Sequence, residues 1–124
     1  MAHTLDYLIF DYSEDDEGNA TWDAMATLTA EQFAPLIDEV ALVLGWAQRH
    51  FAQLRGPLDE GFLWDYDLSL RADNGREIPV QVQWSPVALH YTAPTSSAEL
   101  LTLTLTLSGR NDFAAAFAES FELE

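Results

Sequence analysis

The chain of 124 residues carries 21 acidic and only five basic side chains, all of them arginine, for a formal net charge of −16 at pH 7. Such a charge repels nucleic-acid phosphates and anionic membranes, so neither is an expected partner, and it favours a basic protein partner. A strong net charge also serves solubility alone. Because cysteine is absent, there is no disulfide framework, no thiol nucleophile and no thiolate metal site.

The length suits one domain, residues 1–124. The first residues lack the basic and apolar regions of a signal peptide, and no apolar run is long enough to span a bilayer. We therefore expect a cytoplasmic protein.

The N-terminal part of the chain predicts a β-hairpin. Residues 4–13 alternate as a strand that is apolar on both faces, which suggests cover on both sides, and residues 22–28 resume as a second strand. The turn between them, residues 14–19, holds four successive carboxylates. The alternating ligand spacing of a calcium loop and its distant bidentate Glu are missing, so we interpret this turn as a solvated hairpin tip.

A long amphipathic helix is predicted over residues 29–55. Thr29 and Gln32 have the spacing of a capping box, and apolar residues then recur every three or four positions until a Gly-Pro pair ends the pattern. Pro35 conflicts with a regular helix, so we expect a kink there or a short first turn before the main helix.

The polar face of this helix carries one exception. Leu42 and Trp46 lie one turn apart among charged side chains. Because Trp is enriched at protein contacts, the pair predicts a partner-binding surface. The alternative is that another element of the same chain, the C-terminal helix, covers both side chains.

Two further strands alternate between apolar and polar positions over residues 62–71 and 78–85. Both apolar sets are even-numbered, and a two-residue turn at Asn74-Gly75 would pair even positions with odd ones. A three-residue loop of Asp73, Asn74 and Gly75, with Gly75 left-handed, restores the agreement. Pro79 lacks a donor and indicates an edge position or a bulge.

The last part of the chain predicts the most regular strand and a short helix. Leucines alternate with threonines in residues 99–108. Such a strand is an aggregation hazard at an edge, so we place it inside the sheet. Phe113, Phe117 and Phe121 then repeat on a final helix. The order β-β-α-β-β-β-α predicts an α+β fold with a mainly antiparallel sheet of about five strands, one face covered by the long helix.

No catalytic motif stands out. His3, His50 and His90 lack the spacing of a zinc site, and neither a glycine-rich phosphate loop nor a nucleophile elbow is present. No cofactor or metal is therefore expected.

One pair of carboxylates still suggests a site. Asp65 and Asp67 share a strand face, as members of a catalytic carboxylate pair do. Gln81 and Gln83 would extend this pair into a polar site if they lie across from it. The alternative is the wet outer face of a one-sided sheet.

These patterns favour a non-enzymatic acidic interaction module that binds a basic protein partner or a second copy of itself. The alternative is a small-molecule-binding protein or enzyme, with its site on the Asp65/Asp67 face or between sheet and helix. The candidate partner-binding residues are Leu42, Trp46, Asp65, Asp67, Gln81 and Gln83. In size and acidity the chain is similar to the small cytoplasmic immunity and antitoxin-type proteins of bacteria, in composition only and without a shared motif.

Overall fold

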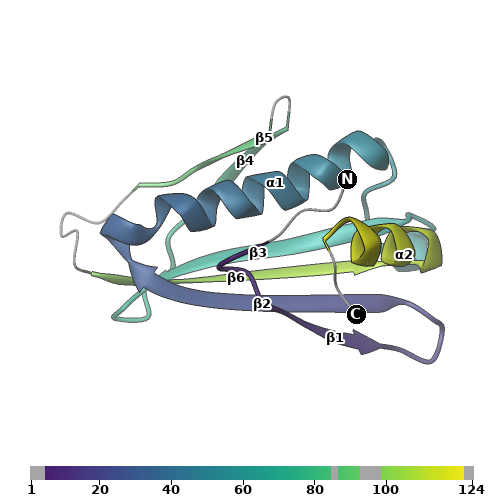
Figure 1. The fold of residues 1–124 in the computed structure, drawn as a ribbon, viewed down its shortest axis with the longest axis horizontal. Helices are drawn as coiled ribbons and strands as arrows, with labels where there is room; N and C mark the ends of the chain where they lie inside the picture. The colour runs from purple at the N-terminus through teal and green to yellow at the C-terminus, as the bar shows by residue number, and fades with distance from the viewer. Residues whose placement is uncertain (1–4, 85–86, 93–98, 122–124) are drawn as a thin grey trace.

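The computed structural model describes residues 5–84, 87–92 and 99–121 (Figure 1). These residues form six strands, two α-helices and two short 3-10 helices, and the α+β class is confirmed. In chain order the elements are β1 Phe10–Glu14, β2 Ala20–Thr29, η1 Ala30–Gln32, α1 Ala34–His50, η2 Leu58–Glu60, β3 Trp64–Ala72, β4 Gln81–Trp84, β5 Val87–His90, β6 Leu100–Gly109 and α2 Asn111–Ser120.

The strands form an antiparallel four-stranded sheet, in the order β1-β2-β6-β3, and a separate β4–β5 hairpin. The Leu/Thr strand, β6, lies between β2 and β3, so its predicted place inside the sheet is confirmed. Its alternation explains this position, because Leu101, Leu103, Leu105 and Leu107 all point to the core and have 0% exposure. A strand buried on one face by leucines has its register fixed by that face.

The loop after β3 has the three residues that the parity of the strands predicts. The N–H of Ala72 donates to the C=O of Arg76 at 2.8 Å, and Gly75 has a φ of 85°. Pairing continues as far as Ile78, whose N–H donates to the C=O of Leu70. Pro79 then removes a donor, and the chain leaves the sheet. Of the predicted strand of residues 78–85, residues 81–84 form β4 and pair with β5 rather than continuing beside β3, and residue 85 lies outside the described residues.

The long helix begins with the short first turn that Pro35 predicts. Residues 30–32 form η1, and α1 follows with Pro35 in its first turn. The predicted capping box is wrong: the Thr29 hydroxyl donates to the Gln32 side-chain oxygen at 3.1 Å, and neither side chain caps the backbone. The helix ends at His50 rather than at residue 55, and Gln53 follows with a φ of 64°.

The first strand is shorter than predicted. Residues 5–9 do not pair with β2, and β1 begins only at Phe10. The N–H groups of Asp6, Tyr7 and Leu8 instead donate to the carboxylate of Glu39 on α1, at 2.6 to 3.1 Å. This carboxylate holds the segment on the helix and lets Leu8 enter the core with 3% exposure. Residue 4 lies outside the described residues.

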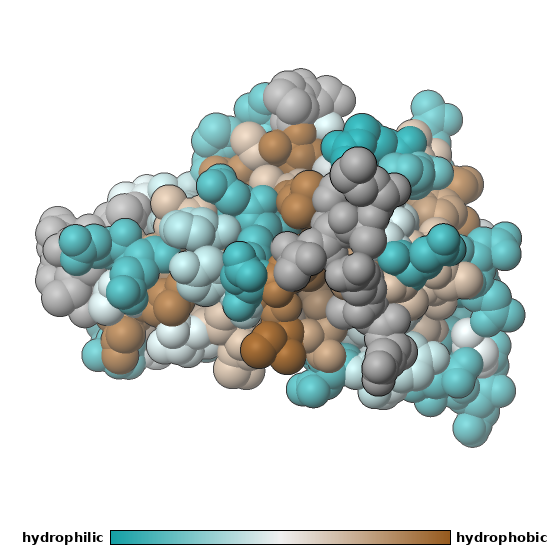
Figure 2. All heavy atoms as spheres, viewed as in Figure 1, coloured by the Kyte–Doolittle hydropathy of each residue, from teal (hydrophilic) through white to brown (hydrophobic). Residues whose placement is uncertain are grey.

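Both helices cover the apolar face of the sheet. Phe117 of α2 packs against Trp22 of β2, and Phe113 stacks on Trp64 of β3 with ring centroids 5.5 Å apart. Trp46 of α1 meets the same phenylalanines, so the two helices and the sheet share one core. Figure 2 shows hydrophobic side chains gathered along the middle of this view, with hydrophilic ones around the margin. Neither α-helix of the described chain is long and apolar enough to cross a membrane.

Candidate functional site

The opposite face of the four-stranded sheet carries a row of polar side chains that crosses all four strands and is acidic on three of them. Asp11 lies opposite Asp23, Asp23 lies opposite Thr106, and Thr106 lies opposite Asp67. We call these four residues the carboxylate row. The Thr106 hydroxyl donates to Asp23 Oδ1 at 2.6 Å, which fixes one carboxylate, while all three aspartates are exposed.

The rows on either side are mostly hydroxyls. The cross-strand neighbours are Ser13–Thr21–Ser108–Asp65 on one side, and Met25–Thr104–Ser69 followed by Thr27–Thr102–Arg71 on the other. The hydroxyls of Thr27 and Thr102 lie 2.8 Å apart and hydrogen-bond across the strands. Carboxylate and hydroxyl oxygens therefore dominate this face, and Arg71 brings the one guanidinium of these rows.

Asp65 and Asp67 lie on this face as the alternation predicts. Asp67 is exposed, whereas Asp65 is half-buried and accepts the N–H of Tyr66 at 2.8 Å. Gln81 and Gln83 do not lie across from them, and this part of the prediction is wrong. Both glutamines belong to the β4–β5 hairpin, where the Gln83 side-chain oxygen lies 3.2 Å from His90 Nε2.

Trp46 is not on the surface. It is 3% exposed and its ring packs against Phe113, Phe117 and Phe121, at centroid distances of 5.6 to 5.8 Å. This position agrees with the alternative interpretation, in which the C-terminal helix covers the Trp46 side chain. Leu42 is half-buried and also packs against the core. We therefore remove Trp46 from the candidate contact surface, because a partner could reach it only by displacing α2.

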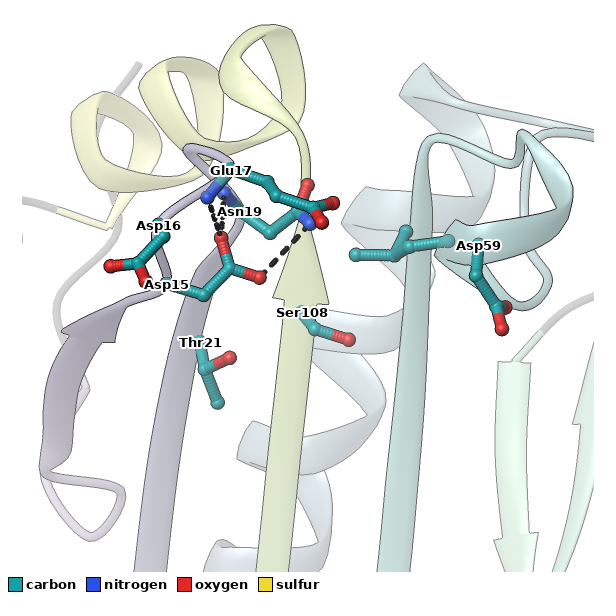
Figure 3. A pocket seen from close by; sticks show the side chains of 8 residues that line it. Asp15, Asp16, Glu17, Asn19, Thr21, Asp59 and Ser108 are labelled. Carbon is teal, nitrogen blue, oxygen red and sulfur yellow. Dashed lines mark hydrogen bonds between the residues drawn. The ribbon is translucent and has the colours of Figure 1, made fainter.

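A hollow of about 620 Å³ lies at one end of this face, beside the β1–β2 turn (Figure 3). Thr21 and Ser108 continue into it from the hydroxyl rows. It is lined by Asp15, Asp16, Glu17, Asn19, Thr21, Leu58, Asp59 and Ser108. In Figure 3, Glu17 extends from the turn toward the side where Asp59 lies, whereas Asp16 points away. The acidic character of the face therefore continues past the carboxylate row.

Asp15 organises this turn from within. Its carboxylate accepts the backbone N–H groups of Asn19 and Glu17, each at 2.9 Å, and the Asn19 side-chain amide at 3.1 Å. The hydrogen bonds from Asn19 are the largest cause of the lowered pKa of Asp15. The turn is thus a fixed, charged tip. Within the described residues no group of three His, Asp or Glu side chains is placed to hold a metal ion.

A second hollow, of about 500 Å³, is lined by residues of α1 and of the β4–β5 hairpin, which pack against each other. The hairpin is joined to the sheet by Arg55, whose guanidinium carbon lies 4.1 Å from the Trp84 ring centroid and 5.5 Å from that of Tyr66. Cation–π contacts of this kind contribute about 0.5–2 kcal/mol each. They bring the hairpin against the β3 side of the sheet and leave the acidic face open.

The sequence alone predicts only part of the acidic face. The clear alternation of β3 predicts Asp65 and Asp67 on this face, whereas Asp11 and Asp23 are not among the residues that the sequence analysis predicts for a site. The alternation of Trp22, Ala24 and Ala26 already places Asp23 on the polar side. Its meeting with Asp11 and Asp67 in one row depends on strand order and register, which the sequence does not state.

Comparisons with protein-family models, with curated proteins and with solved structures find no match to this chain. The binding chemistry of the site must therefore be inferred from the side chains of this face. Open carboxylate and hydroxyl oxygens accept hydrogen bonds from ammonium and guanidinium groups.

Proposed function

We propose that this protein is a non-enzymatic binding module that recognises a basic protein partner through the acidic sheet face. The observation that carries the proposal is the carboxylate row, in which Asp11, Asp23 and Asp67 are exposed on the face that neither helix covers. A net charge of −16 adds long-range attraction for a basic partner and raises the rate of encounter. The cytoplasmic location expected from the sequence is kept as part of the proposal.

The energetics of the row support this proposal. Asp11 and Asp23 lie directly opposite each other on neighbouring strands, and like charges at such positions destabilise a sheet. A cationic partner side chain placed between them would remove the repulsion on binding. Small-molecule binding is less favoured, because the space between sheet and helices is filled by the core and the hollows lie at the margins.

The proposal is tested with two triple variants that remove the same charge from different surfaces. The face variant combines Asp11→Asn, Asp23→Asn and Asp67→Asn. The control variant combines Glu31→Gln, Asp38→Asn and Glu119→Gln, three exposed positions on or beside the helices. Binding of an arginine-rich peptide is measured for both by isothermal titration calorimetry at low and high salt.

At about 0.5 kcal/mol for each exposed ion pair, the face variant should bind roughly tenfold more weakly than the wild type. The control variant should change affinity by less, and wild-type binding should weaken as salt increases. Equal losses in the two variants, or binding that does not respond to salt, would show that the face is not the contact surface.

A further inference from the structure

One edge of the sheet is only half occupied. β2 has ten residues, and β1 pairs with only five of them, ending at the Phe10–Ala24 pair. Residues 25–29 of β2 continue along β6 but have no strand on their other side within the described chain. Figure 1 shows the segment before β1 leaving this edge and crossing β2, while β2 runs on toward the start of α1. An open strand edge presents unpaired backbone groups that can pair with another chain.

The hydrogen bonds at the two ends of β2 show which groups face this open edge. The N–H of Asp15 donates to the C=O of Asn19 next to the β1–β2 ladder, and the N–H of Ala30 donates to the C=O of Glu99 next to the β2–β6 ladder. Because the direction alternates along an antiparallel strand, odd-numbered residues of β2 face β1 and even-numbered residues face β6. The backbone N–H and C=O of Thr27 therefore point to the unoccupied side.

The open segment lacks two of the residue types that usually protect a sheet edge. Its sequence is Met-Ala-Thr-Leu-Thr, without a charge or a proline, whereas natural edges are commonly blocked by lysine, proline, bulges or cover. Met25 is 68% exposed, and Ile9, which immediately precedes β1, is 77% exposed. Both side chains flank the Phe10–Ala24 pair in sequence, where the β1–β2 ladder ends.

The other edge of the sheet differs. Isolated bridges join β3 to neighbouring chain at both ends, Arg55 with Trp64 and Arg71 with Glu77. Between them, Arg55 lies over the Tyr66 ring. Both edges leave about five residues unbridged, but on β3 the Trp84 ring also packs against Tyr66 within that stretch.

The chain's own N-terminal segment has the length and pattern to fill this edge, yet it is held elsewhere. Extending the β1–β2 register would place Leu8 opposite Ala26 and Tyr7 opposite Thr27, which matches apolar and polar faces. The three N–H groups that Glu39 binds keep residues 5–9 on α1 instead. β2 thus has an open edge, and the segment of the same chain that could pair with it is bound to α1 instead.

We propose that residues 25–29 of β2 accept an extended segment of a basic partner as an added β-strand. The inference rests on the proposed function and names its binding mode. Backbone pairing with Thr27 would supply the affinity common to such complexes, and alternate lysine or arginine side chains of the segment would reach the exposed Asp23 and Asp11. A second copy of this chain is a poorer occupant, because two molecules of net charge −16 repel each other.

The test uses two peptides with the same charge and the same side chains. The first alternates Lys and Val over about ten residues, enough to span the open edge. The second carries N-methyl groups on all of its residues, which removes every backbone hydrogen-bond donor and blocks strand pairing in either register without changing the charge. Binding is measured by calorimetry, and exchange of the Thr27 backbone amide is followed by NMR, with the Leu68 amide of β3 as an internal control on the opposite edge.

The proposal expects the unmethylated peptide to bind at least about tenfold more tightly and to slow Thr27 exchange by a similar factor, with Leu68 unchanged. Equal binding of both peptides with unchanged Thr27 exchange overturns strand addition and leaves the proposed function standing. Absence of binding by either peptide at low salt overturns both. Protection of Thr27 that rises with the concentration of the protein alone assigns the edge to a second copy and overturns the proposal.

Discussion

Replacing Glu39 by alanine tests the contact that separates the N-terminal segment from the sheet. The Glu39 carboxylate is the acceptor for the N–H groups of Asp6, Tyr7 and Leu8. Without it, three backbone donors lose their partner, and the burial of Leu8 loses its support. Because the site is half-exposed, water can satisfy the donors, so the cost lies below that of burying three unpaired groups.

The size of the effect follows from these contacts. A hydrogen bond to a charged group contributes about 1.5–3 kcal/mol when shielded, and solvent access lowers this to about 0.5–1 kcal/mol for each of the three. We therefore expect Glu39→Ala to lower the free energy of unfolding by about 2 kcal/mol. Complete release of the segment would also lose the burial of Leu8, about 1.5–3 kcal/mol, but the freed backbone regains entropy of similar size.

Urea denaturation measures the change in the free energy of unfolding, and amide hydrogen exchange shows which residues lose protection. In Glu39→Ala the amides of Asp6, Tyr7 and Leu8 should lose their protection while those of β6 keep theirs. The adjacent Asp38→Ala is the matched control, since Asp38 is exposed, and should change stability by less than about 0.5 kcal/mol. Unchanged protection in Glu39→Ala, or equal losses in the two variants, would refute this account of how the segment is held.

Four further predictions follow from single contacts. Trp46→Ala should lower the free energy of unfolding by about 3–5 kcal/mol in urea denaturation, because removal of a buried indole leaves a cavity. A loss below about 1 kcal/mol would show that Trp46 is exposed. Gly75→Ala should cost about 1 kcal/mol, because φ is 85°, and an unchanged denaturation midpoint would exclude the left-handed loop. Asp15 should titrate by NMR below its ordinary range, since hydrogen bonds from Asn19 lower its pKa. The contribution of Asp15 to stability is present above its unfolded-state pKa and is lost as the pH falls through its folded-state pKa. A titration of Asp15 in the ordinary range, with no change at Asn19, would contradict these hydrogen bonds. Asp11→Thr should raise stability by about 0.2–1 kcal/mol by removing like-charge repulsion while weakening peptide binding, and a destabilised variant would contradict the repulsion.

The parts of the fold that local pattern controls could be predicted from the sequence. The Leu/Thr alternation of β6 requires one buried face, and the shared parity of residues 62–71 and 78–85 requires a three-residue loop at Gly75. Pro35 sets a short first turn because its ring cannot follow a helical turn. In each case the deciding residues are neighbours in sequence, so their physical constraint can be read without the rest of the chain.

The features that the sequence did not predict depend on contacts between distant parts of the chain. Residues 5–9 have a strand pattern, and only the distant Glu39 prevents the pairing. Trp46 has polar neighbours in sequence, yet α2 covers it from about 70 residues away. Both outcomes depend on contacts between elements that share no local signal. The same holds for the carboxylate row, whose members come from four strands.

The contrast between two rows of one sheet face supports the proposal that its acidity serves binding. Where Thr27 meets Thr102, the hydroxyls hydrogen-bond across the strands and stabilise the sheet. Where Asp11 meets Asp23, the same geometry places like charges opposite each other. Threonine in place of Asp11 would fit the same strand and remove the repulsion, so solubility alone does not require a carboxylate at this position. A carboxylate at such a position gains most when a cation binds it, and the open edge at Thr27 lies on the same side of β2.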